Sequence, residues 1–253
     1  MNEKALRTLE YHKIIDLLVR HANCEAAKQR CKKLTPMTSL ADIETAQRQT
    51  ADALSRIFKK GSLSFLGVHD VTASMKRLEI GAALSIEELL HLASLLEVAK
   101  RAKAYSRNDR TEEAETSDSL DEFFDGIEPL TPLLEEIRRC IISSDEISDD
   151  ASSGLKAVRR SMKGMQDKIH SQMNSILNSA SASGLLQDNV ITMRNGRYCL
   201  PVKSEYKNQV SGMVHDQSST GSTFFIEPAA VVNLNNQLKE LDLQEQEEIE
   251  VIL

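Results

Sequence analysis

The chain has 253 residues, of which 41% are hydrophobic, 27% are charged and only 4% are aromatic. This length is enough for one large domain or two smaller ones with a hydrophobic core. The composition is typical of a helical protein and excludes the collagen-like and mostly disordered classes. The net charge of −7 argues against a generally basic nucleic-acid coat protein.

The net charge hides an alternation along the chain. Residues 1–110 carry a net charge of +6, residues 111–150 of −12, residues 151–215 of +6 and residues 216–253 of −7. Any contact with a polyanion is therefore expected within one of the two positive blocks.

The cysteines and the N-terminus indicate a reducing, cytoplasmic setting. The cysteines are Cys24, Cys31, Cys140 and Cys199. They have no CxxC spacing, the N-terminus lacks the apolar run of a signal peptide, and no stretch approaches the ~20 apolar residues of a membrane span. The first two cysteines lie near His12 and His21 but match no usual zinc-finger spacing. We therefore expect free thiols, no metal site and no membrane partner.

Helix signals dominate the first half of the chain. Apolar residues at helical spacing predict helices over 9–22, 25–34 and 39–61. In the first of these, one face collects Ile14, Leu17, Leu18 and His21. Ser39 is placed to begin the third helix and Gly61 to end it. We expect these helices to pack together in a core domain.

Two local signals follow. Ser85 and Glu88 form a capping box that opens another helix. Residues 106–126 are acidic and poor in aliphatic side chains, so we predict a solvated loop to which no role is assigned. A further helix is predicted from Pro129 to Ile142, and Ser152 or Ser153 is placed to cap the helix after it.

Two segments repeat apolar residues at alternating spacings of three and four. The first comprises Leu155, Val158, Met162, Met165, Ile169, Gln172 and Ile176, and the second comprises Val231, Leu234, Leu238, Leu241, Glu245, Glu248 and Ile252. This heptad spacing predicts an antiparallel coiled-coil arm. The alternative is that either helix is an ordinary member of a helix bundle.

The segment between the two heptad helices has strand periodicity. Asn195-Gly196 separates two short β-prone runs, and this dipeptide suits a two-residue hairpin because both turn positions need a positive φ. A second hairpin is predicted from 212–216 and 223–227, and Pro228 is placed at the start of the returning helix. We therefore expect a small antiparallel β module at the end of the arm.

No catalytic motif is evident. His215, Asp216 and Ser218 have the residue types of a hydrolase triad, but no nucleophile elbow or oxyanion donors accompany them. The simpler interpretation is that residues 216–220 hydrogen-bond the backbone of their own turn. Phosphate-loop, dinucleotide-binding, metalloprotease and paired-carboxylate nuclease patterns are missing from the sequence. We therefore expect no enzyme activity and no cofactor in this stretch.

The second positive block offers candidate phosphate contacts. On the first heptad helix the basic side chains at helical spacing are Lys156, Arg159, Arg160 and Lys163, and the β module adds Arg194, Arg197, Lys203, Lys207 and His215. Lysine and arginine along a rigid element bind phosphates without reading sequence. The alternative for the helical stripe is a solvated flank that pairs with the acidic returning helix, through Glu240, Glu245, Glu247 and Glu248.

The segment 188–241 closely resembles the second bacterial branch of the MutS family (endonuclease MutS, type II). It contains RNGRY, PVK, the G-x-V-H-D-Q-S turn, the IEP strand end and V-x-L-N-N. LEYHKIIDLL near the N-terminus, LSIEELL and DDAS also match, so the resemblance covers nearly the whole chain. After HDQS the family pattern is S-x-S-G-x-T, and this sequence has Thr220 at the middle position, which keeps a hydroxyl.

The resemblance implies a mainly α fold with four parts. They are a helical core domain (1–125), ascending lever helices (126–187), a clamp-like β module (188–228) and a returning lever helix (229–253). It also implies a larger parent, a homodimeric ATPase with ATP and Mg in a phosphate-loop motor domain, followed by a C-terminal endonuclease domain. Because the sequence stops inside a helical pattern, we expect a chain truncated before the motor.

Members of this branch bind branched DNA and are associated with suppressing homologous recombination and with rescuing collided ribosomes, where the partner is ribosomal RNA. The resemblance thus implies a non-catalytic segment that binds nucleic acid. The alternative is a coiled-coil protein-interaction module without nucleic-acid binding.

Overall fold

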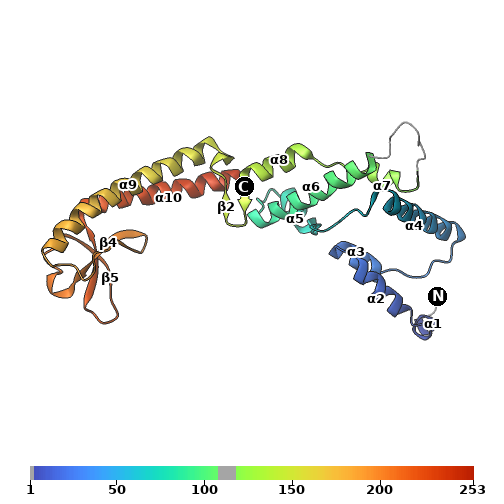
Figure 1. The fold of residues 1–253 in the computed structure, drawn as a ribbon, viewed down its shortest axis with the longest axis horizontal. Coiled ribbons are helices and arrows are strands. Elements are labelled where there is room, and N and C mark those ends of the chain that lie inside the picture. Colours follow the sequence, from blue (N-terminus) through green and yellow to red (C-terminus); the bar gives the residue numbers. More distant parts are fainter. Residues whose placement is uncertain (1–2, 108–117) are drawn as a thin grey trace. The chain divides into compact units, whose positions relative to one another are not determined.

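The computed structural model describes residues 3–107 and 118–253, with the side chains of residues 181 and 182 left aside. The described residues are mostly helical, as the sequence predicts, and they include two small antiparallel sheets. The chain divides into two compact units, one that extends to Glu146 and one from Ile147 to Ile252. Figure 1 shows the helices and strands of the two units.

The first unit is built almost entirely of helices. They are α1 (Glu3–Thr8), α2 (Tyr11–His21), α3 (Glu25–Lys32), α4 (Leu40–Lys60), α5 (Thr72–Glu79), α6 (Ile86–Arg107), α7 (Asp121–Asp125) and α8 (Thr131–Cys140). After α8 the chain forms β1 (Ile141–Ser143), which pairs with β2 (Glu146–Ile147). The helix predicted from Pro129 to Ile142 therefore ends earlier, at Cys140, and β1 begins at the next residue.

The second unit contains two long helices and a four-stranded sheet. Its elements are the 3₁₀ turn η1 (Asp149–Ala151), α9 (Ser153–Ala182), β3 (Thr192–Arg194), β4 (Arg197–Lys203), η2 (Ser204–Tyr206), β5 (Gly212–Gln217), β6 (Thr223–Pro228), η3 (Ala229–Val231) and α10 (Val232–Ile252). The strand order is β3-β4-β6-β5 and the neighbouring strands are antiparallel.

Several predicted helix ends are confirmed. The Ser85 N–H donates to Glu88 Oε2 at 2.9 Å, and the Glu88 N–H donates to Ser85 Oγ at 3.2 Å, which completes the capping box. Ser152 Oγ accepts from the Leu155 N–H at the start of α9. Ser39 precedes α4 but its side chain makes no capping bond, and Gly61 ends that helix with a φ of 81°.

The buried residues of the first unit lie mainly on α6 and α8. They include Ala93, Leu96, Val98, Ala102, Leu134 and Ile137. The helices expected to pack as a core are more open, since α2 and α3 contain no buried residue. On the apolar face of α2, Ile14 is 60% exposed. The prediction of a packed first helix is therefore wrong for this unit as it stands.

Part of the predicted acidic loop 106–126 is ordered by a buried cation. Residues 108–117 lie outside the described residues. Beyond them, Asp118 and Asp121 both pair with Arg56 of α4, and residues 121–125 form α7. A solvated loop is thus the wrong interpretation for 118–125, because two of its carboxylates compensate a guanidinium that is buried in the first unit.

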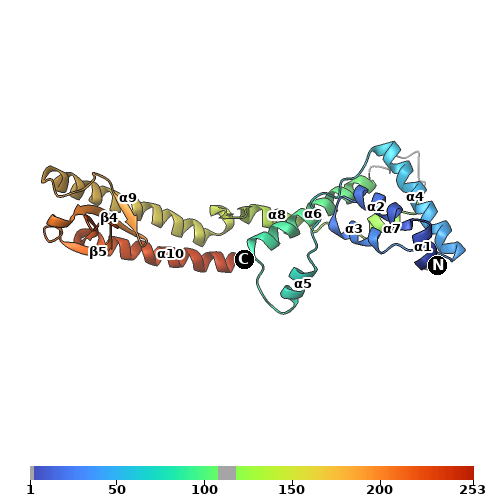
Figure 2. The ribbon, with the colours of Figure 1, turned by 90° about the horizontal axis from the view of Figure 1, so that it is seen from below.

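Helices α9 and α10 pack side by side and antiparallel (Figures 1 and 2). Ser152, just before α9, bonds Glu248 near the end of α10, and Arg159, about two turns further along α9, pairs with Glu245. All seven predicted positions of the returning segment are buried or half-buried. The expected pairing of the two helices is confirmed, and a coiled-coil lever remains a prediction.

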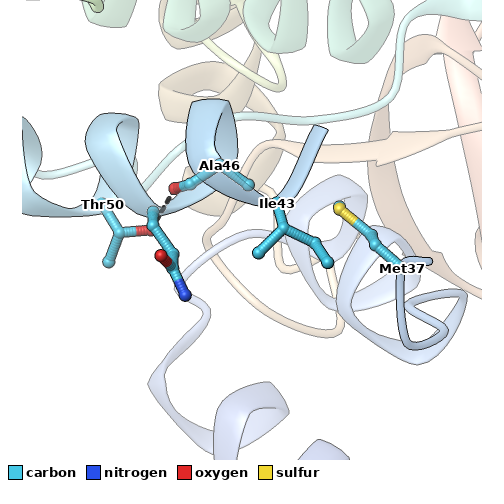
Figure 3. A pocket seen from close by; sticks show the side chains of 5 residues that line it. Met37, Ile43, Ala46 and Thr50 are labelled. Carbon is cyan, nitrogen blue, oxygen red and sulfur yellow. Dashed lines mark hydrogen bonds between the residues drawn. The ribbon is translucent and has the colours of Figure 1, made fainter. Parts of the chain in front are cut away.

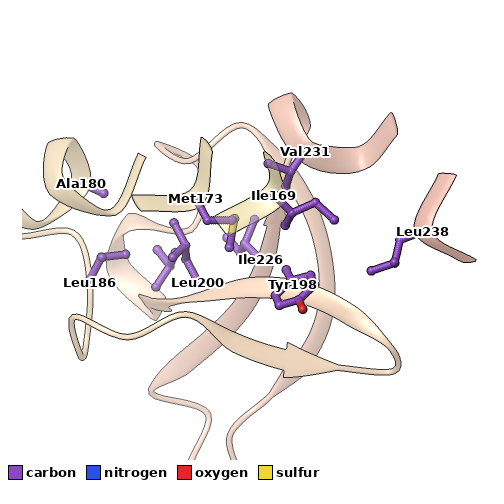
Figure 4. Packing of buried hydrophobic residues seen from close by; sticks show 10 residues of the cluster. Ile169, Met173, Ala180, Leu186, Tyr198, Leu200, Ile226, Val231 and Leu238 are labelled. Atoms are coloured by element: carbon purple, nitrogen blue, oxygen red, sulfur yellow. The ribbon is translucent and has the colours of Figure 1, made fainter. Parts of the chain in front are cut away.

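The predicted apolar repeat on α9 changes phase after Ile169. Gln172, placed on the seam by heptad spacing, is exposed, whereas Met173 is fully buried. Met173 and Ala180 pack with Leu200 of β4 and Ile226 of β6 in one hydrophobic cluster (Figure 4). The end of α9 therefore packs against the sheet, and the face of the helix that it buries follows the sheet and not the heptad.

The sheet follows the predicted hairpins. Asn195 and Gly196 join β3 to β4 with φ values of 51° and 73°, as a two-residue turn requires. Strands β5 and β6 form the second hairpin. At Gly212 the backbone of β5 comes so close to β6 that a Cβ would overlap the Glu227 carbonyl, so only glycine fits there.

Candidate nucleic-acid interface

The buried carboxylate of Glu227 organises the β module. Glu227 is 0% exposed, and its oxygens are 2.7 Å from Asn235 Nδ2, 3.1 Å from Arg197 Nη1 and 2.5 Å from His215 Nε2. Asn235 Oδ1 in turn accepts from the backbone N–H of Tyr198. This network joins β4, β5 and β6 to α10, because each of these elements supplies a partner.

A β-bulge brings His215 to this network. Val214 pairs with Ile226 and Asp216 pairs with Phe225, so His215 is the extra residue in β5. A bulge re-aims a side chain relative to regular strand alternation. The His215 carbonyl also accepts from Asn195 Nδ2 at 3.2 Å, which ties the β3–β4 turn to the bulge.

Two of the predicted phosphate-binding residues of the module are thus directed at Glu227. Arg197 is paired with its carboxylate, and His215 lies against it from β5. The Arg197 guanidinium compensates this buried charge, and the His215 ring contacts it. They are held as structural residues of the module, a role that the sequence analysis did not anticipate.

The other three cations of the module lie further out. The Arg194 guanidinium lies 3.9 Å from the centroid of the Phe225 ring and its Nε is 3.3 Å from Asp216. Lys207 Nζ lies 4.6 Å from the centroid of Phe224. Cation–π contacts of this kind hold a cation in place while it keeps its charge.

Lys203 is anchored by the backbone. Its Nζ donates to the Gly184 carbonyl at 3.1 Å, beside the chain that enters the module. An ammonium has three N–H donors, so this bond leaves others for a phosphate.

The four basic residues of the stripe on α9 also form two groups, one paired with protein groups and one exposed. Arg159 donates to the Ile147 carbonyl, to Asp149 and to Glu245. Burial alone would lower the pKa of Arg159, but the hydrogen bonds to Asp149 and Glu245 outweigh it and raise the pKa. Lys156 is paired with Asp150 at 2.6 Å. Within the described residues, the expected pairing with the acidic returning helix is therefore confirmed for Arg159 alone.

Arg160 and Lys163 occupy the outer side of the stripe. Both are exposed, and no hydrogen bond or ion pair of either is found within the described part of the chain. Their charges are consequently available to an external anion.

The residues of the hypothetical triad have other partners. His215 faces Glu227, and Ser218 Oγ accepts from the Thr223 N–H at 3.1 Å. The Gly221 N–H donates to the Ser218 carbonyl, which closes the turn. The polar side chains here bond the turn itself, as the sequence analysis expects.

The thiols of the chain are free. Cys24 and Cys31 are half-buried, while Cys140 and Cys199 are buried. Burial, together with the nearby Glu227 carboxylate, raises the pKa of Cys199 to about 11. Among the described residues, no three His, Cys, Asp or Glu side chains gather as metal ligands would, and no described helix is long and apolar enough to cross a membrane.

The first unit carries a shallow hollow at the start of α4. It is lined by Met37, Ile43, Ala46, Gln47 and Thr50 (Figure 3). Thr50 Oγ1 is bonded to the Ala46 carbonyl within the helix. None of the lining residues is charged, so the hollow has no cation that would attract a phosphate.

Comparison with known proteins finds several proteins named endonuclease MutS2 that are similar to this chain. The chain is 56% identical over 253 residues to endonuclease MutS2 of Agathobacter rectalis, 58% over 257 residues to endonuclease MutS2 of Lachnoclostridium phytofermentans, and 51% over 253 residues to endonuclease MutS2 of Lachnospira eligens. The chain is similar to MutS2 proteins along its whole length. The matches cover 100% of this chain and 31–32% of these relatives, so it spans about a third of their length. No protein-family model matches it.

Two residues whose role sequence reasoning missed lie inside motifs of the segment 188–241. Glu227 lies in the IEP strand end and Asn235 in V-x-L-N-N. A signal was present for Glu227, which interrupts the apolar run 224–232. Asn235 had no such signal, because Asn233, Asn236 and Gln237 flank it. The sequence alone did not indicate that the two side chains bond each other.

Proposed function

We propose that this chain is the core, lever and clamp segment of a MutS-type homodimeric ATPase, and that its β module binds nucleic acid. The similarity to MutS2 proteins along the entire chain carries this proposal. The segment itself is non-catalytic, and ATP, Mg and the endonuclease activity belong to other parts of the parent. The protein acts in the cytoplasm.

The ligand is a phosphate backbone, of branched DNA or of ribosomal RNA. Arg194, Lys203 and Lys207 are the contacts that we favour on the module, and Arg160 and Lys163 extend the surface along α9. These five cations do not compensate Glu227, so a phosphate can approach them without uncovering a buried charge. Binding of this kind supports roles in suppressing recombination and in rescuing collided ribosomes.

The salt dependence of binding tests the proposal. In the triple variant Arg194→Ala, Lys203→Ala and Lys207→Ala, we expect weaker binding to a four-way DNA junction and to a ribosomal RNA fragment. Each lost phosphate contact lowers the slope of log K against log salt by about 0.9 for duplex DNA and about 0.7 for single strands. The slope should therefore fall by about 2 to 3, measured by fluorescence anisotropy over a salt series.

A matched control uses three exposed lysines of the first unit. Lys32→Ala, Lys33→Ala and Lys76→Ala remove the same charge, and the slope should stay that of the unmodified chain. Circular dichroism confirms that both triple variants are folded. An unchanged slope in the module variant would remove the module from the interface.

The alternative is a protein-interaction module that uses the paired helices and the acidic side of α10. It predicts no measurable binding of the 253-residue chain to DNA or RNA at physiological salt, together with binding to a second copy of the parent. The same anisotropy series separates the two functions.

A further inference from the structure

Arg194 and Phe225 form a stacked pair on the β module. The guanidinium carbon of Arg194 lies 3.9 Å from the centroid of the Phe225 ring. This separation is that of van der Waals contact between flat groups, so the guanidinium uses one of its two faces against the ring. Phe225 is half-buried, and its backbone in β6 pairs with Pro201 of β4 and with Asp216 of β5. The ring is thus a fixed support for the cation.

Two edges of the guanidinium are fixed as well. Its Nη1 donates to the Met193 carbonyl at 2.9 Å, and its Nε lies 3.3 Å from Asp216 Oδ2. Asp216 is itself oriented, because its Oδ1 accepts from the Gln217 N–H at 2.8 Å. The N–H donors of a guanidinium lie in its plane. The ring and these two partners therefore fix both the position and the tilt of that plane.

The opposite face of the guanidinium is open. The Arg194 side chain is 37% exposed although it has three contacts. Because these contacts use one face and two edges, the exposed part includes the second face and the edge at Nη2. In the described parts of the chain, no second ring lies over this cation. A flat group from outside the protein can therefore stack on it.

A nucleobase is the flat group that fits this face. Arginine planes stack on the bases of nucleic acids, chiefly on unpaired bases that have left the helical stack. A guanidinium is weakly hydrated and stacks on aromatic faces, whereas an ammonium is a strongly hydrated point charge. Lys207 lies 4.6 Å from the centroid of Phe224, but its ammonium has no flat face. Of these two cation–ring pairs, only Arg194 on Phe225 can extend into a longer stack.

We propose that Arg194, supported by Phe225, is a stacking platform for one unpaired nucleobase. This inference rests on the proposed binding of nucleic acid by the β module. It specifies what the module binds at this point, which is a base outside the double helix, as at a branch point, a bulge or a loop. The edge at Nη2 stays available to a phosphate beside that base. Because every base has a flat face, the contact does not read sequence.

Two duplexes that differ by one base test the proposal. The first has a single bulged adenine, and in the second an abasic residue replaces that adenine, so the two duplexes carry the same charge. An unpaired base leaves the helical stack at a low free-energy cost. We expect the 253-residue chain to bind the adenine bulge at least about fivefold more tightly, as the stacking of one base implies. Fluorescence anisotropy measures both affinities, with DNA strands and with RNA strands, and the preference in either supports the proposal.

The variant Arg194→Lys separates stacking from charge. Lysine keeps a positive charge for the phosphate but has no flat face. This variant should bind the abasic duplex as the unmodified chain does, with the same salt slope, and should lose the preference for the adenine bulge. Arg160→Lys is the matched control, because Arg160 is an exposed arginine of α9 with no ring against it in the described structure. It should keep the preference, and circular dichroism confirms that both variants are folded.

The outcomes distinguish this inference from the proposed function. Equal binding of the adenine and abasic duplexes by the unmodified chain, in DNA and in RNA, would overturn the stacking platform. An adenine preference that survives in Arg194→Lys would overturn it as well. Both results leave salt-dependent binding to phosphates in place. Binding of neither duplex at low salt would instead contradict the proposed function, and this inference with it.

Discussion

At the scale of single residues, Glu227 is the centre of the polar network of the β module. Its carboxylate is fully buried and is compensated by Arg197, His215 and Asn235. Removing one partner of a buried charged network costs far more than removing an exposed ion pair. The stability of the β module therefore depends on a residue that contacts no ligand in the proposed interface.

Glu227→Gln should lower the free energy of unfolding of the second unit by about 3 kcal/mol, because Arg197 and His215 lose the charge that they face. Urea unfolding followed by circular dichroism measures this change. Glu205→Gln, at an exposed position of η2, should change stability by less than about 0.5 kcal/mol. Equal stability of the two variants would show that the network is dispensable.

Asp118 makes the first unit sensitive to acid. Its hydrogen bond from Arg56 holds the pKa of this carboxyl below its ordinary value of 3.8. A lowered pKa in the folded state stabilises the fold at pH values above the ordinary pKa, and this contribution is lost as the pH falls through the folded value. Stability from this pair is thus complete at neutral pH and declines below about pH 3.8.

We expect Asp118→Asn to cost about 2 kcal/mol at pH 6, the range of a hydrogen bond to a charged group. The difference from the unmodified chain should shrink as the pH is lowered toward 2.5, since protonation then removes the same charge. Urea unfolding at several pH values gives the comparison. Asp16→Asn, at an exposed position of α2, serves as control, and a pH-independent loss in Asp118→Asn would contradict the account.

At the scale of elements, the phase change on α9 distinguishes packing against the sheet from a continuous heptad. Met173→Ala should lower the free energy of unfolding by about 3 kcal/mol, because it empties a buried site beside β4 and β6. Gln172→Ala on the exposed neighbouring position should cost less than about 0.5 kcal/mol. Differential urea unfolding of the two variants measures this, and a larger loss at Gln172 would restore the heptad prediction.

The elements predicted correctly from sequence are those fixed by local interactions. The Ser85–Glu88 capping box, the Ser152 cap and the Asn195-Gly196 turn each depend on residues close in the chain. The phase change at Met173 depends on strands β4 and β6, which lie more than twenty residues further along the chain. Helical periodicity alone therefore cannot predict it.

The same distinction applies to the candidate interface. Sequence reasoning found its nine basic residues but could not separate them. Arg159 and Arg197 pair with carboxylates that lie 86 and 30 residues away, whereas Arg160 and Lys163 stay exposed. The Arg56–Asp118 pair, 62 residues apart, was missed for the same reason.

At the scale of the whole molecule, the overall charge of −7 describes neither unit well. In the second unit, the acidic residues of α10 and the residues before α9 pair with part of the basic stripe, and the remaining cations lie on the outer part of α9 and on the module. An acidic chain can in this way present a local surface for a polyanion.

Lysine footprinting tests the central claim most directly. The 253-residue chain is acetylated with and without a four-way DNA junction or a ribosomal RNA fragment, and the modified lysines are identified by mass spectrometry. The account predicts that nucleic acid protects Lys163, Lys203 and Lys207, while Lys32, Lys33 and Lys76 of the first unit react as before. Protection of the first-unit lysines alone, or protection of no lysine, would contradict the proposed interface.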